Sequence, residues 1–222
     1  MKNLTYLTTI LVVLVLTALA GCGTPYATVP NRAGEPVMLL GHDPVAYFTK
    51  GEPTRGKAEF SMNLPARTYY FASAENKDIF AANPVRYEPQ YGGFCASGAA
   101  FNIKLGSDPT SWQIYDGRLF IFGDVLGQNA WQVDPKWNVD HGDRLWPGIK
   151  DKGWRGASLA AYASKVPHYK TGAQIRAEWE LKNPGKTWPT YDVGGMMSNL
   201  FTKPPGWRAA EGHSQPALGY PD

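Results

Sequence analysis

Cys95 is the residue of this chain with the richest chemistry. A cysteine thiolate is both a nucleophile and a ligand for soft metal ions. Gly92-Gly93 precedes Phe94-Cys95 and Ala96-Ser97-Gly98 follows it, so the backbone here can adopt positive φ angles and approach other groups closely. We therefore expect the sulfur to lie in a pocket floored by three aromatic residues, Tyr47, Tyr91 and Phe94. The alternative is that Cys95 is a small buried hydrophobic residue, as free cysteines usually are.

The second cysteine, Cys22, lies at the end of an N-terminal secretory signal. Met1-Lys2 is a positive start, and an apolar stretch from Leu7 to Leu16 follows it, which is too short to span a bilayer. The next residues, Leu19-Ala20-Gly21-Cys22, closely resemble the bacterial lipoprotein signal motif. This resemblance implies cleavage after residue 21, lipid on the Cys22 thiol and an acylated amino group. Gly23, rather than Asp, follows the cysteine and favours the outer membrane, with the protein facing the periplasm.

If lipid occupies Cys22, Cys95 has no cysteine left in the chain with which to form a disulfide. Two cysteines also cannot make a disulfide framework or a closed Cys-rich zinc site. A redox role, in which Cys95 is reversibly oxidised and reduced, would need an external thiol because there is no resolving cysteine.

Composition and motifs exclude several classes of protein. A net charge of +3, with both signs interspersed, gives no electrostatic footprint for nucleic acid. No Gly-rich phosphate loop precedes a helix, and no Gly-x-Ser-x-Gly motif occurs. Asp140 and Asp143 are interpreted as part of a solvated turn around His141 rather than as an acid–base pair. We therefore predict no catalytic residues, and a binding role rather than an enzymatic one.

Local signals predict an α+β fold of antiparallel hairpins and short helices. Capping residues precede the predicted helices, and Asp-Gly is typical of a two-residue hairpin turn. The predicted elements are a helical turn after Asp43-Pro44, a hairpin of residues 60–64 and 67–71, a helix from Ser73 to Asn83, a hairpin around Asp116-Gly117 and a helix from Asp124 to Val133.

Residues from about 41 to 147 resemble the YHS domain family, in its branch of secreted proteins. The matching stretches are residues 43–48 (DPVAYF), 70–76 (YFASAEN), 87–95 (YEPQYGGFC) and 112–117 (WQIYDG), in the order and spacing of the family. YHS domains are associated with metal binding, so the resemblance implies that the Cys95 thiolate binds a soft metal. The better-known metal-binding members have additional cysteines, which this chain lacks.

Copper is the metal that the remaining ligands suit best. Cys95 could be joined by one or two of His42, His141 and a methionine such as Met62. A thiolate with imidazole or thioether ligands suits Cu(I), which accepts soft ligands and a low coordination number. The predicted metal site is therefore Cys95 with His42 and His141.

The resemblance and the local signals together divide the chain into five parts. They are a signal peptide (1–21), a flexible tether (22–35), the YHS-like domain (36–149), a helical extension (150–202) and a mobile tail (203–222). The extension is predicted to contain helices at residues 158–166 and from Thr171 to Asn183. Most of the tryptophans follow residue 130. They are interpreted as packing residues or, alternatively, as an aromatic face that contacts sugar rings of an envelope polymer or a partner protein.

Overall fold

The computed structural model describes residues 23–156 and 170–189. It confirms a mixed α+β fold. The elements are β1 (Thr28–Pro30), β2 (Pro36–Met38), η1 (Leu39–Gly41), α2 (Ala46–Thr49), β3 (Lys57–Leu64), β4 (Arg67–Phe71), α3 (Ala74–Ala82), α4 (Pro84–Tyr87), η2 (Gln90–Gly93), α5 (Ala96–Ala100), β5 (Asp108–Tyr115), β6 (Arg118–Phe122), α6 (Val125–Gln132), α7 (Pro135–Leu145), η3 (Trp146–Gly148) and α9 (Gly172–Lys182).

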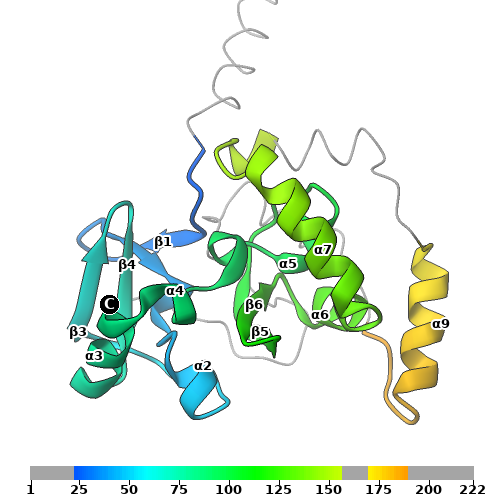
Figure 1. Ribbon diagram of the computed structural model, residues 1–222, viewed down its shortest axis with the longest axis horizontal. Helices are drawn as coiled ribbons and strands as arrows, with labels where there is room; N and C mark the ends of the chain where they lie inside the picture. The colour runs from blue at the N-terminus through cyan, green and yellow to red at the C-terminus, as the bar shows by residue number, and fades with distance from the viewer. Residues whose placement is uncertain (1–22, 157–169, 190–222) are drawn as a thin grey trace, which may run out of the picture.

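A four-stranded sheet forms one end of the molecule, in the order β1-β2-β4-β3 (Figure 1). The predicted hairpin of β3 and β4 is confirmed: the strands are antiparallel and pair Asn63 with Thr68. Ala66 lies in the turn with a φ of 61°. β2 runs parallel to β4, so the sheet is mixed. Its buried side chains meet α3 in a core that contains Tyr69, Phe71 and Phe80.

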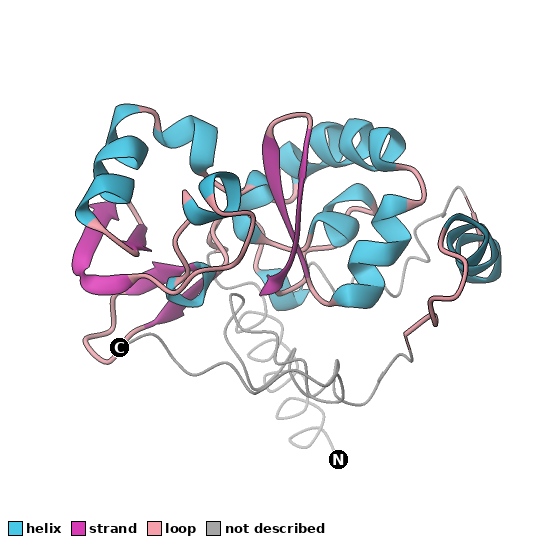
Figure 2. Ribbon diagram, turned by 90° about the horizontal axis from the view of Figure 1, so that it is seen from below, coloured by secondary structure: helices cyan, strands magenta, loops and turns pink. Residues whose placement is uncertain are grey.

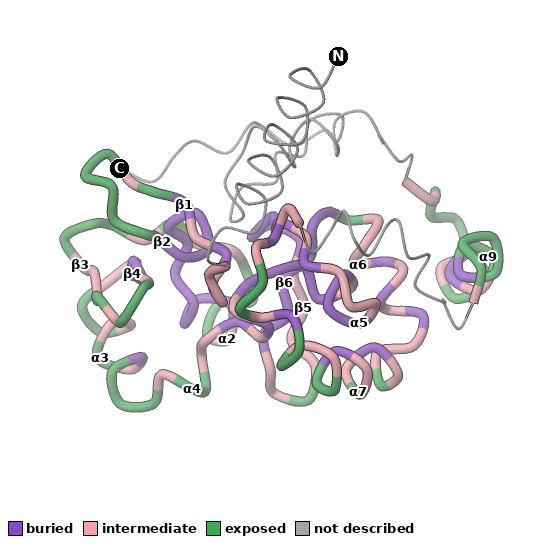
Figure 3. Tube along the Cα trace, turned by 90° about the horizontal axis from the view of Figure 1, so that it is seen from above, coloured by how far each residue is buried: buried purple, intermediate pink, exposed green. Residues whose placement is uncertain are grey.

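A two-stranded hairpin, β5–β6, stands among helices α5, α6 and α7 in the other half (Figure 2). Asp116 and Gly117 form its turn with φ angles of 48° and 68°, as the Asp-Gly pair predicts. β6 contributes Phe120 and Phe122 to a second core cluster around Trp131 of α6. Figure 3 shows the buried residues gathered in these two cores, whereas α3, α4 and the edge strand β3 consist mainly of exposed and intermediate residues.

The helix caps predicted at Ser73, Asp124 and Thr171 are confirmed. The side chain of Ser73 accepts a hydrogen bond from the backbone N–H of Asn76 at the start of α3. Asp124 does the same for Gly127 at the start of α6. Thr171 and Gln174 form a reciprocal capping box on α9. These signals act within four residues, so they do not depend on the rest of the fold.

The tether prediction for residues 22–35 is wrong for its described part. Residues 28–30 form strand β1 and pair with β2. Ala27 and Val29 are buried, and the N–H of Ala27 donates to the carbonyl of Gly92 at 2.8 Å. Residues 27–30 show no clear hydrophobic periodicity in the sequence. They are ordered because strand β2 and η2 provide backbone hydrogen-bond partners for them.

The loop prediction around His141 is also wrong, because residues 135–145 form helix α7. Asp134 caps this helix through the N–H of Trp137, and Pro135 occupies a first-turn position.

In the extension, α9 packs Ile175 and Trp179 against Val133. The helix predicted at residues 158–166 and the tail at 203–222 lie outside the described residues. No helix within 23–156 or 170–189 combines the length and apolarity needed to cross a membrane.

Candidate functional site

Cys95 lies in the interior, where its side chain is only 2% exposed. It precedes α5, and its backbone N–H donates to the carbonyl of Leu105 at 3.0 Å. Its sulfur faces α6 at Gly127, where a Cβ atom would lie 3.9 Å from Sγ. Ser97 fixes the same contact, because its hydroxyl donates to the carbonyl of Gly127 at 2.5 Å. The thiol is therefore enclosed by small residues of two helices.

His42 is a buried structural histidine. Its Nδ1 lies 2.8 Å from the carbonyl oxygen of Leu39, so Nδ1 carries the proton and donates. Burial lowers the pKa of His42 to about 4; the bond to Leu39 opposes this shift, and the nearby cation of Arg55 adds to it. The imidazole is therefore neutral at pH 7 and helps to hold the turn of η1.

His141 lies on α7 and stacks on Trp137, with ring centroids 3.7 Å apart. Its Nδ1 is 2.9 Å from the carbonyl oxygen of Trp137, one turn earlier. Both contacts are local to the helix. In turn, Trp137 packs against Phe101 at the end of α5.

These three residues do not assemble the predicted metal site. In residues 23–156 and 170–189, no group of three or more His, Cys, Asp or Glu side chains could hold a metal ion together. Cys95 lies between α5 and α6, and Nδ1 of His42 and Nδ1 of His141 each bind a backbone carbonyl of their own segment. In the described residues, Cys95, His42 and His141 therefore do not form a three-ligand site.

The three aromatic residues expected to floor a pocket at Cys95 all lie in the interior of the protein. Tyr47, Tyr91 and Phe94 belong to three different core clusters. Tyr47 belongs to the first core and donates through its hydroxyl to the carbonyl of Pro109 at 2.8 Å. Tyr91 and Phe94 both pack against Trp146, with ring centroids 5.8 and 5.7 Å from it, and the backbone between them is left-handed, since Tyr91, Gly92 and Gly93 have φ angles of 54°, 58° and 77°.

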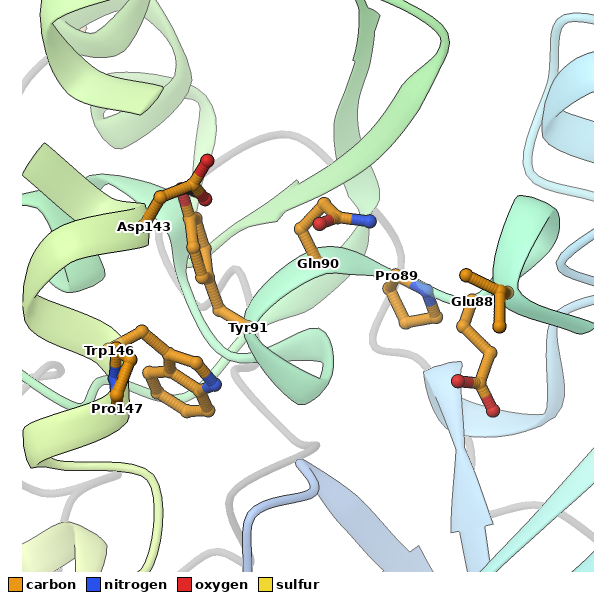
Figure 4. A pocket seen from close by; sticks show the side chains of 8 residues that line it. Glu88, Pro89, Gln90, Tyr91, Asp143, Trp146 and Pro147 are labelled. Atoms are coloured by element: carbon orange, nitrogen blue, oxygen red, sulfur yellow. Dashed lines mark hydrogen bonds between the residues drawn. The ribbon is translucent and has the colours of Figure 1, made fainter. Parts of the chain in front are cut away.

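A pocket of about 370 Å³ lies between α4–η2 and the end of α7 (Figure 4). Its volume is within the usual range for small-molecule sites. Aromatic and proline side chains form much of its wall, while two carboxylates and an amide supply polar groups. The lining residues are Val85, Glu88, Pro89, Gln90, Tyr91, Asp143, Trp146 and Pro147.

Arg118 fixes the polar wall of this pocket. Its Nη1 and Nη2 donate to the two carboxylate oxygens of Asp143 at 2.8 and 2.7 Å. Its Nε and Nη2 donate to Oε1 of Gln90 at 3.0 and 2.7 Å. These bonds hold Oε1 of Gln90 on the guanidinium, so its amide N–H₂ is turned away from Arg118. In the described part of the chain this amide nitrogen makes no hydrogen bond.

The hydroxyl of Tyr91 completes this network by donating to Oδ1 of Asp143 at 3.1 Å. Hydrogen bonding from Arg118 lowers the pKa of Asp143. Burial raises the pKa of Tyr91, and the charge of Asp143 adds to that effect. The pocket therefore presents a fixed carboxylate and a neutral phenol at pH 7. The Tyr91 ring also packs against Trp146, with centroids 5.8 Å apart.

A second arginine orders the other end of the pocket. Nε and Nη2 of Arg67 donate to Oε1 of Glu88 at 2.9 and 2.6 Å. Arg67 is itself held by the hydroxyl of Tyr26 at 2.8 Å. Oε2 of Glu88 makes no hydrogen bond within the described residues, so it can accept one from a ligand.

Sequence reasoning missed this pocket. The local sequence around Asp143 suggests a solvated turn, but Asp134-Pro135 is a recognisable helix start that places Asp143 on α7. Gln90 lies in one of the stretches quoted for the YHS resemblance. No local signal links these two residues, because Arg118 of the hairpin connects them in space.

No family model, curated protein or solved structure matches this chain. The resemblance to the YHS family therefore stays a prediction that rests on the residue stretches quoted above.

Proposed function

We propose that this protein is a non-enzymatic, lipid-anchored binding protein of the bacterial outer membrane, and that it binds a saccharide of the cell envelope in the pocket beside Tyr91. The lipoprotein signal that ends at Cys22 supports the anchor and the periplasmic location. The observation that carries the binding proposal is the combination of an aromatic wall with polar groups held in place by arginines.

The chemistry of a sugar suits this combination. A sugar ring has apolar C–H faces that pack on aromatic side chains such as Trp146, and its hydroxyls both donate and accept hydrogen bonds. The pocket provides a donor in the Gln90 amide and an acceptor in Oε2 of Glu88. Because Arg118 and Arg67 already hold these side chains, less conformational entropy is lost when a ligand binds.

Calorimetric titration with oligomers of N-acetylglucosamine tests the saccharide. The change Gln90→Glu keeps an oxygen facing Arg118 but removes the amide donor, and we expect roughly tenfold weaker binding. Gln113→Glu is the matched control, since Gln113 lies on β5 and bonds to Gln132; its affinity should equal that of the wild type. Absence of binding to the wild type, or equal affinities of the wild type and Gln90→Glu, would contradict the proposal.

The anchor has its own test. Mass spectrometry of the membrane-extracted protein should show an acylated Cys22 as the first residue. Cys22→Ser should move the protein from the membrane fraction to the soluble fraction. Unmodified wild-type protein in the soluble fraction would refute the anchor without bearing on the pocket.

Copper binding through Cys95 is supported only by the sequence. The measurement that decides it is a competition titration with a Cu(I) chelator for the wild type and Cys95→Ser. Clearly tighter binding by the wild type would establish copper as a ligand, whereas equal affinities would leave the buried thiol with a packing role.

A further inference from the structure

The N-terminal segment that follows the proposed lipid anchor is packed onto the domain from its first described residue. Gly23 lies so close to the segment that follows η3 that a Cβ atom there would be 2.1 Å from the backbone carbonyl carbon and oxygen of Lys152. Only glycine avoids this overlap. A second close contact involves Pro25, two residues after Gly23: a Cβ atom on Gly92 would collide with the carbonyl oxygen of Pro25.

The buried side chain of Lys104 binds the N-terminal segment through hydrogen bonds. This side chain is fully buried, and Nζ donates to the carbonyls of Thr24, Lys150 and Lys152 at 2.6, 2.6 and 2.9 Å. Nζ also lies 4.6 Å from the ring centroid of Phe94. One ammonium therefore joins the residue next to Gly23 to the chain segment 150–152.

This attachment leaves little chain between the lipid and the domain. Consecutive Cα atoms are about 3.8 Å apart, so the Cα atoms of Cys22 and Thr24 are separated by at most roughly 7.6 Å. This reach is similar to the thickness of one headgroup layer, which is about 5–8 Å. A lipid on Cys22 therefore cannot enter a bilayer while the domain stands well away from it.

We infer that the domain lies directly against the phospholipid surface, and that the residues around Gly23 and the segment 147–155 face the headgroups. This inference rests on the proposed lipidation of Cys22. Both segments lie on the same side of the molecule, and α2 lies on the opposite side (Figure 1). The proposed pocket, lined in part by Trp146 and Pro147, then lies close to the membrane.

The charge of this face matches an anionic lipid surface. Between residues 150 and 155 there are three cationic side chains, Lys150, Lys152 and Arg155, and one carboxylate, Asp151. Asp151 pairs with Lys150 at 2.6 Å. Basic residues beside a membrane anchor are attracted to acidic headgroups.

Spin-label accessibility in vesicles tests the orientation. The lipidated protein, in a Cys95→Ala background, is reconstituted into vesicles of phosphatidylethanolamine and phosphatidylglycerol that contain a nickel-chelating lipid. A nitroxide is attached at Lys152→Cys or, as the control on the opposite side, at Lys50→Cys beyond α2. We expect the surface-bound nickel to enhance relaxation several-fold more at position 152 than at position 50.

A linker variant shows whether the short attachment causes the orientation. A flexible Gly-Ser linker inserted between Cys22 and Gly23 leaves the contacts of Gly23 and Lys104 intact, and it should abolish the difference between the two labels. Equal enhancement at both positions in the unmodified chain, or a difference that survives the linker, would overturn the inference. Mass spectrometry confirms acylation in every sample, so a failure of lipidation is detected separately.

Discussion

The ammonium of Lys104 donates a hydrogen bond of 2.6 Å to the carbonyl of Thr24, 80 residues earlier in the chain. Burial lowers the pKa of Lys104 to about 8, so the side chain is protonated at neutral pH. All three of its N–H groups are then available for the three carbonyls that surround it. This arrangement attaches the N-terminal segment to the domain.

Removing this ammonium should loosen the segment and destabilise the fold. Lys104→Met nearly keeps the length of the side chain but removes the donor from three partly buried carbonyls, at a cost of about 3 kcal/mol in the free energy of unfolding. Chemical denaturation measures the cost, and hydrogen exchange should show lost protection of the Ala27 amide. Lys136→Met, on the exposed face of α7, should leave the denaturation midpoint unchanged. Equal midpoints for the wild type and Lys104→Met would contradict this role.

His42 should make the stability of the protein depend on pH between about 4 and 6.5. Its pKa is about 4 in the folded state and 6.5 in the unfolded state, so the unfolded chain binds more protons in this window. The free energy of unfolding therefore falls as the pH is lowered from 6.5 to 4, by up to about 3 kcal/mol.

The variant His42→Asn isolates this effect, because its amide can still donate to the carbonyl of Leu39 but does not titrate. Denaturant titrations at several pH values should show a smaller fall in stability for the variant than for the wild type. Parallel pH profiles of the two proteins would exclude His42 as the cause.

Asp43 should contribute more to stability than an ordinary helix cap. Its fully buried carboxylate accepts hydrogen bonds from the backbone N–H groups of Val45, Ala46 and Ala72, and from the side-chain amide of Asn76 at 2.6 Å. It therefore links the start of α2 to β4 and α3. Asp43→Ala leaves several buried donors unsatisfied and should cost about 3–4 kcal/mol.

Asp134→Ala provides the comparison for Asp43→Ala, since Asp134 caps α7 through the N–H of Trp137. Its loss should cost about 1 kcal/mol. Thermal or chemical unfolding of both variants measures the difference, and similar losses for the two would show that Asp43 is an ordinary cap.

Cys95 should be inert in the folded protein. Its side chain is 2% exposed, so a thiol reagent reaches it only when the structure opens. Labelling of the Cys22→Ser form with a chromogenic disulfide should be at least about a hundredfold slower in buffer than in denaturant. Fast labelling in buffer would instead favour the redox role considered from the sequence.

The confirmed predictions concern features that depend on neighbouring residues. The caps at Ser73, Asp124 and Thr171 and the turn at Asp116-Gly117 need partners within four positions. The predictions that were wrong concern partners that are distant in the chain. The supposed tether folds because Gly92 and Lys104 bind it, and the residues around His141 form a helix whose Asp143 is bound by Arg118, 25 residues earlier.

By itself, the sequence determined the α+β class and the capped starts of α3, α6 and α9, because each is encoded by composition or by a short run of residues. Only the tertiary structure decided that Cys95 is enclosed and that both histidines bind local carbonyls. It also decided that Arg118 brings Gln90 and Asp143 to one pocket. The physical reason is that a side chain's burial and charge environment depend on segments tens of residues away, and no local pattern records which segments pack together.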